Sequence, residues 1–97
     1  MFRHVVVFTW TPEATAEQRA AAISGLRDWA GQCTGYGTLT LGVDAGLAEG
    51  NGDAVVVVDL PDRETYAAYA ADERHRALIR DRIAPILARR CAVQHEL

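Results

Sequence analysis

The sequence contains no lysine, and its ten basic residues, all arginine, are outnumbered by thirteen acidic ones, giving a net charge of −3. A general nucleic-acid binder needs a basic face that displaces counterions from the phosphate backbone. Most of the arginines lie between Arg63 and Arg90, where acidic residues are interspersed with them. That mixture is typical of a solvated helix face, so we expect no nucleic-acid partner.

Cysteine is scarce, and long hydrophobic runs are absent. Cys33 and Cys91 form no CxxC motif and are too few for a disulfide framework. Because each lies in an apolar stretch, we expect buried free thiols, as in proteins of the reducing cytoplasm. The apolar run that opens the chain spans about eight residues, too few for a membrane span and without the flanks of a signal peptide. We therefore expect a cytoplasmic protein with no membrane partner.

Cofactor motifs are missing as well. His4, His75 and His95 lack the spacing of metal ligands and have no clustered carboxylate or thiol. The glycines between Asp44 and Asp53 indicate a turn-rich loop and not a phosphate-binding loop at the start of a helix. We expect no metal and no cofactor. The 97 residues fit a single domain over 1–97.

Four segments have the β-branched, aromatic or alternating pattern of strands. The first places His4, Val6 and Phe8 on one face and Val5 and Val7 on the other. Both faces of the first and third segments are apolar, which indicates strands covered on both sides. The predicted strands are Arg3 to Trp10, Thr38 to Val43, Ala54 to Leu60 and Cys91 to Leu97.

Helices are predicted between these strands. Thr15 and Gln18 have the spacing of a capping box, which predicts a helix from Ala16 to Gln32 that is ended by glycines in a positive-φ conformation at Gly35 and Gly37. Asp62 is suited to cap a second helix. A third helical stretch is predicted from Arg74 to Ala88, and we expect Pro85 to kink or end it.

The resulting βαββαβ order predicts an α+β, ferredoxin-like fold in which a four-stranded antiparallel sheet carries helices on one face. The other face of the sheet is apolar and has no helix left to cover it. A bare apolar face on a small domain marks an association surface. We therefore expect a homodimer in which two sheets pack together as a dimeric α+β barrel.

The chain resembles the dimeric α/β-barrel stress-response (Dabb) family over nearly its whole length. The resemblance is carried by His4 to Phe8 at the start, Gly42 to Asp44 before the glycine-rich loop, Ala54 to Leu60, and Tyr69 followed six residues later by His75. The resemblance implies a homodimer. Many members of the family have no assigned reaction. One branch comprises plant polyketide cyclases such as olivetolic acid cyclase, which close a ring by aldol condensation without a cofactor.

That resemblance implies a site. In the cyclase branch, residues matching Tyr69 and His75 act in a cavity between sheet and helices, and a histidine matching His4 lines it. The family's His-Pro-x-His turn is altered here, because Asp72 and Glu73 replace its first histidine and its proline. The residue types suit the chemistry, since imidazole is a base near neutral pH and a phenol donates a hydrogen bond to an enolate. His75 and Tyr69 are thus the catalytic candidates, with His4, Val6 and Phe8 as ligand-binding candidates.

Two functions remain open from the sequence. The first is a stress-response dimer without catalysis that binds a small apolar ligand, and the second is a cofactor-free polyketide cyclase-like enzyme. A pocket of roughly 300 Å³ or more with convergent polar groups favours the enzyme. The bulk of Phe8, Trp29, Tyr36 and Tyr66 favours a filled space. Haem-degrading monooxygenases share the barrel, but the first strand offers no asparagine and no tryptophan follows the third.

Overall fold

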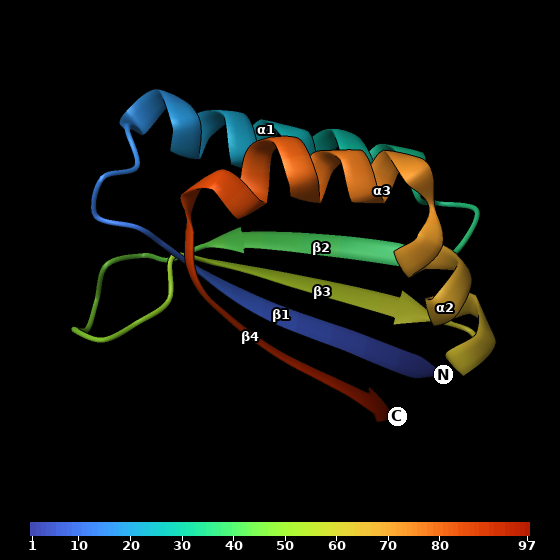
Figure 1. Cartoon of the computed structure of the whole chain (residues 1–97). Helices are drawn as coiled ribbons and strands as arrows, with labels where there is room; N and C mark the ends of the chain where they lie inside the picture. The colour runs from blue at the N-terminus through green and yellow to red at the C-terminus, as the bar shows by residue number, and fades with distance from the viewer.

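The computed structural model describes residues 1–97, which fold as a sheet with its helices laid across one side (Figure 1). The chain forms three helices and four strands, and the third helix continues into a π-helical turn and a short 3-10 turn. The elements are β1 (Phe2–Trp10), α1 (Ala16–Gln32), β2 (Thr38–Val43), β3 (Ala54–Leu60), α2 (Arg63–Ala71), α3 (Glu73–Leu78), the π turn (Ile79–Ile83), the 3-10 turn (Ala84–Ile86) and β4 (Leu87–Glu96).

The sheet is antiparallel and has the strand order β2-β3-β1-β4. The two strands that are apolar on both faces, β1 and β3, lie at its centre, with Val6 opposite Val56. The edge strand β4 pairs with the other side of β1, so that Val93 lies opposite Val5. This arrangement confirms the predicted ferredoxin-like α+β fold.

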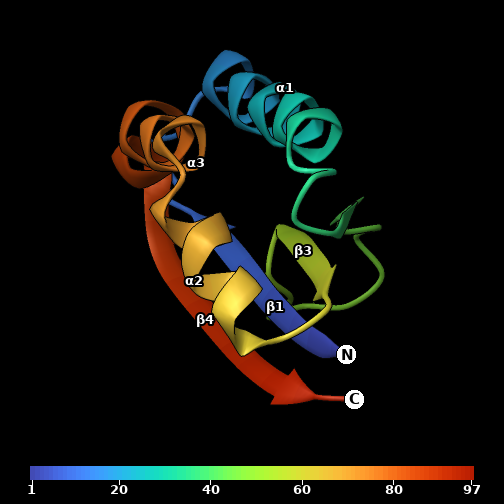
Figure 2. The ribbon, with the colours of Figure 1, turned by 90° about the vertical axis from the view of Figure 1, so that its right-hand side faces the viewer.

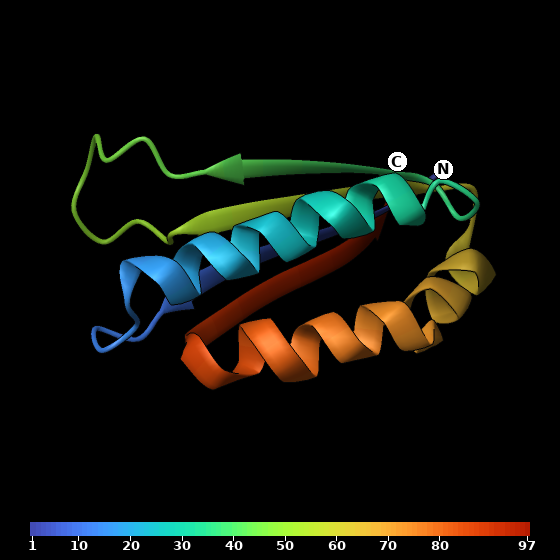
Figure 3. The ribbon, with the colours of Figure 1, turned by 90° about the horizontal axis from the view of Figure 1, so that it is seen from above.

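All the helices cover the same face of the sheet. Figure 3 shows α1 and α3 running side by side in opposite directions above the strands, with α2 at one end. Burial alternates along β1 because every second side chain points toward these helices. The fully buried side chains come from both layers. The largest of them are Trp29, Leu60, Ile83, Val56, Val58 and Cys33.

The opposite face of the sheet has no helix over it (Figure 2). Its centre is a valine band, formed by Val5, Val7, Val55, Val57 and Val93, which the strand register places on one face. The first four are half-buried by their neighbours, whereas Val93 is 58% exposed. The band is an exposed apolar patch of the kind that marks an association surface.

Cys91 also lies on this bare face, opposite Val7 in the strand register. It is an exposed free thiol, whereas Cys33 is a buried one. The prediction of a buried thiol is therefore right for Cys33 and wrong for Cys91. Cys91 lies in an apolar stretch of the sequence, which suggested burial. In the structure, however, its side chain belongs to the sheet face that no helix covers.

The start of α1 follows its sequence signature. The Thr15 hydroxyl accepts a hydrogen bond from the Gln18 N–H at 3.1 Å, and the Gln18 side chain accepts one from the Thr15 N–H at 2.9 Å. The predicted glycine ending is wrong, because neither Gly35 nor Gly37 has a positive φ. Gly37 instead lets the chain pass close to β3, where a Cβ atom would overlap the carbonyl oxygen of Asp59.

The boundary between α3 and β4 lies earlier than predicted. Helical structure ends at Ile86, and β4 begins at Leu87 instead of Cys91. Pro85 ends the helix, as expected, because it lacks an N–H and its ring clashes with the carbonyl four residues before it. The backbone widens into the π turn just ahead of this point, where the Ala84 N–H donates to the Ile79 carbonyl. As a result, Arg89 and Arg90 belong to a strand.

The loop between Asp44 and Asp53 is closed at its base. The Asp44 N–H donates to the Asp53 carbonyl at 2.9 Å, and the Asp53 N–H donates to the Phe8 carbonyl at 2.8 Å. The Asp53 carboxylate accepts a third hydrogen bond, from the Trp10 N–H at 2.7 Å. These bonds tie the end of β1 to the start of β3 independently of the loop's path.

Candidate functional site

A cavity of about 270 Å³ lies between the sheet and the helices α2 and α3. All five residues that the sequence singled out, His4, Val6, Phe8, Tyr69 and His75, line it. The sequence also favoured a space filled by bulky side chains, but Trp29 and Tyr36 pack against Tyr69 and do not line the cavity. The remaining lining residues are Leu26, Val56, Tyr66, Ala70, Ile79, Ile83, Leu87 and Arg90.

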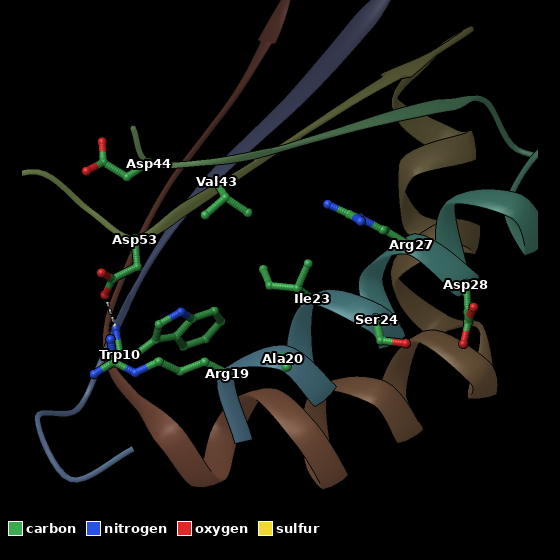
Figure 4. A pocket seen from close by; sticks show the side chains of 10 residues that line it. All are labelled: Trp10, Arg19, Ala20, Ile23, Ser24, Arg27, Asp28, Val43, Asp44 and Asp53. Carbon is green, nitrogen blue, oxygen red and sulfur yellow. Dashed lines mark hydrogen bonds between the residues drawn. The ribbon is translucent and has the colours of Figure 1, made fainter. Parts of the chain in front are cut away.

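A larger cleft of about 610 Å³ lies between α1 and the end of the sheet where β2 and β3 meet the loop (Figure 4). It is more open to solvent than the cavity and contains no histidine or tyrosine. Its polar groups are partly in use, because the Arg19 guanidinium donates to the carbonyls of Ala14 and Thr11 and Asp53 is bound to Trp10. The smaller, more enclosed cavity is therefore the candidate site.

His75 reaches the cavity from the first turn of α3. Its Nδ1 lies 3.2 Å from the Ala70 carbonyl oxygen, which can only accept, so the ring hydrogen is on Nδ1. Burial lowers the pKa of His75 below its usual 6.5, and this outweighs the Ala70 carbonyl and Asp72, which both raise it. The ring is therefore neutral at pH 7, with Nε2 as its basic nitrogen.

His4 has the opposite tautomer. The amide nitrogen of Gln94, which can only donate, lies 2.9 Å from Nδ1 of His4, so the ring hydrogen is on Nε2. Burial lowers the pKa of His4 to about 4, with further lowering by the positive charge of Arg90 and by that of His75 once His75 is protonated. His4 therefore stays neutral at pH 7 and can donate a hydrogen bond through Nε2.

The ring of Tyr69 lies near both histidine rings. Its ring centroid lies 4.9 Å from that of His75 and 6.3 Å from that of His4. Its hydroxyl oxygen accepts a hydrogen bond from Trp29 Nε1 at 3.1 Å, while its own proton has no acceptor in the chain. Burial raises the pKa of Tyr69 to about 12, so the phenol is a neutral donor at pH 7.

Asp72 sets the position of His75. Its carboxylate accepts hydrogen bonds from the Arg74 N–H at 2.9 Å and from the Tyr36 hydroxyl at 2.7 Å. The first of these caps α3, and the second ties the cap to the segment that follows α1. The Arg74 side chain and the Tyr36 hydroxyl hold the pKa of Asp72 well below its usual range. The residue that replaces a histidine of the family's turn thus remains a charged N-cap.

Sequence reasoning missed two polar residues of the cavity, Tyr66 and Arg90. Tyr66 lies one helical turn before Tyr69, and its ring centroid is 5.0 Å from that of His4. Arg90 lies opposite Phe8 in β4 and shares the helix-facing side of the sheet with it. Strand alternation would have found Arg90 had the strand been predicted to begin before Cys91.

No three His, Cys, Asp or Glu side chains come together in an arrangement that could hold a metal ion. None of the helices is long and apolar enough to cross a membrane.

The fold and the cavity define a class of protein, the ferredoxin-like α+β domains that keep a pocket between the sheet and its helices. Within that class, the sequence model of the stress responsive A/B barrel domain (Dabb) matches residues 2–96, so this chain belongs to the Dabb family. No curated protein matches it by sequence.

Solved structures agree with this assignment. A dimeric ferredoxin-like protein of unknown function from Thermobifida fusca is 36% identical, with a TM-score of 0.89 over 99% of this chain and 90% of that one. A Dabb family protein from Mesorhizobium loti is 17% identical, with a TM-score of 0.81 over 99% and 95% of the two chains. Hydroxynitrile lyase from Passiflora edulis shares the fold at 9% identity, with a TM-score of 0.83 over 99% and 92%.

The lowered pKa of His4 predicts a pH dependence of stability. Between pH 6.5 and about 4 the unfolded chain binds a proton that the folded chain excludes, so stability falls as the pH falls. Compared with a His4→Gln variant, the wild type should lose about 2 kcal/mol more unfolding free energy between pH 7 and pH 4.5. Urea unfolding at both pH values measures this difference, and equal losses in the two proteins would contradict it.

Proposed function

We propose that this Dabb protein works as a homodimer and binds a small, largely apolar molecule in the cavity between the sheet and helices α2 and α3. The cavity carries the proposal, because eight of its thirteen lining residues have hydrocarbon side chains and the others are His4, Tyr66, Tyr69, His75 and Arg90. An apolar space with a few convergent polar groups is the usual form of a small-molecule site. The free thiols of Cys33 and Cys91 fit a reducing compartment such as the cytoplasm.

The valine band supports the homodimer. It lies on the face that no helix covers, and a second copy of the same band would bury it by a two-fold contact. The related Thermobifida fusca protein is described as dimeric. Arg3 and Asp59 pair at the margin of this face, at 2.6 Å, and form part of a polar rim around the band.

Val93→Asp tests the dimer. In the proposed contact the new carboxylate would be buried without a partner, at a cost of several kcal/mol, so we expect a monomer in light scattering at micromolar concentration. Val43→Asp is the matched control, because Val43 is 57% exposed, close to the 58% of Val93, and lies on the other face of the opposite edge strand. A dimeric Val93→Asp variant would contradict the proposed interface.

Ala70→Leu tests the cavity. Ala70 is half-buried and lines the cavity, so three additional carbon atoms would occupy space that a ligand needs. With benzyl alcohol as the probe, titration by NMR should show binding to the wild type and at least about tenfold weaker binding to the variant. Ala67→Leu, at an exposed position of the same helix, should bind like the wild type. Unchanged binding by Ala70→Leu would place the probe elsewhere.

The tautomers of the two histidines favour a second candidate function, cofactor-free cyclisation of a small polyketide. Nε2 of His75 would take a proton from a carbon between two carbonyls, and the electron pair of the broken C–H bond would move onto a carbonyl oxygen. Nε2 of His4 or the Tyr69 hydroxyl would donate to that enolate oxygen. The enolate carbon would then attack a second carbonyl, closing the ring as that oxygen takes up a proton.

His75→Ala separates the two candidates. Without the base, cyclisation of a linear poly-β-keto thioester should fall to the uncatalysed rate, while Tyr69→Phe should reduce it about 10²-fold. Because the pKa of His75 is lowered, the wild-type rate should rise with pH only below 6.5 and then level off. A His75→Ala variant that remains dimeric and as active as the wild type would exclude this mechanism.

A further inference from the structure

Arg90 is the one charged side chain among the residues that line the cavity. It lies opposite Phe8 in the register of β4 with β1, which turns it toward the helices, whereas its neighbour Arg89 lies opposite Thr9 on the bare face. Arg90 is also exposed as a residue, so its side chain borders the cavity at its mouth. A guanidinium there meets a ligand that enters from solvent.

No carboxylate neutralises Arg90. It takes part in none of the ion pairs of the chain, and Glu64, the acidic residue of α2, takes part in none of them either. Glu96 shares its strand face but lies six residues along β4, about 20 Å away, and is paired with Arg63 at 2.7 Å. Asp72 is paired with Arg74, and Asp81 with Arg80.

The other polar groups of the cavity do not cancel this charge. His4 and His75 are neutral at pH 7, and the positive charge of Arg90 contributes to lowering the pKa of both. Tyr66 and Tyr69 are uncharged phenols. The cavity therefore combines an apolar interior with one uncompensated positive charge, which is complementary to an apolar molecule with one negative charge.

We propose that Arg90 anchors the carboxylate of a small aromatic or alicyclic acid whose ring occupies the cavity. The assignment rests on the proposed ligand-binding function and specifies its ligand class. A carboxylate matches the two parallel N–H groups of a guanidinium in a bidentate contact. A phosphate monoester, with nearly two negative charges, would require donors beyond this single guanidinium. A volume of about 270 Å³ restricts the ligand to roughly one ring with short substituents.

The test uses benzoate and benzamide, which have nearly the same shape but differ in charge. Isothermal titration of the wild type should show benzoate binding about tenfold or more tightly than benzamide, and phenyl phosphate more weakly than benzoate. Arg90→Gln should weaken benzoate binding by about tenfold and leave benzamide unchanged. Arg76→Gln is the control, because it removes the same charge from an exposed residue of α3 that does not line the cavity, and it should behave like the wild type.

The outcomes distinguish this assignment from the proposed function. If benzamide and benzyl alcohol bind but Arg90→Gln leaves the preference for benzoate unchanged, Arg90 is not the anchor and the ligand-binding function stands. If phenyl phosphate binds more tightly than benzoate, the assignment to a carboxylate is overturned. If the wild type binds none of these probes, the ligand-binding function and the anchor are both wrong.

Discussion

The central strands β1 and β3 carry apolar side chains on both faces, while the chain provides helices for only one, and the rest of the structure depends on this imbalance. On the covered side, the helices bury the alternate residues of β1 from Phe2 to Trp10, and Tyr66 of α2 packs against Phe2 and His4. On the other side the valine band stays at the surface. A protein of this size buries a limited fraction of its surface on folding, so contact with a second copy would add much to its core.

The covered face is not packed uniformly, and this difference gives rise to the cavity. Toward α1, Trp29 fills the layer and holds the Tyr69 hydroxyl. Toward α2 and α3 the layer retains space beside His4 and His75, and the π turn broadens the helix at Ile79 and Ile83 on the cavity wall. Burial keeps both imidazoles neutral, and different hydrogen-bond partners keep them in opposite tautomers. The protein thus maintains a donor and an acceptor in one apolar cavity, each with its ring near that of Tyr69.

Most of this architecture could be predicted from the sequence because local signals agreed with the tertiary structure. The capping box placed the start of α1 correctly, and strand alternation placed His4, Val6 and Phe8 in one layer. The start of β4 could not be found in the same way, since the tract from Leu87 to Arg90 has neither an apolar alternation nor a turn signal. Arg90 was missed for that reason. The cavity beside Tyr69 could not be predicted either. Its existence depends on how the helices are placed relative to one another, and the sequence of one segment does not determine that placement.

The hydrogen bonds at the base of the loop from Asp44 to Asp53 hold the strands in place, so the geometry of the sheet does not depend on the length of that loop. Three hydrogen bonds near Asp53 join β1, β2 and β3 below the loop, and no residue of the loop lines the candidate site under α2 and α3. Lengthening a loop whose ends are already held together adds little closure entropy, about 0.6 kcal/mol for each doubling. The tip of this loop is therefore the natural point at which to insert a foreign peptide or reporter without disturbing the domain.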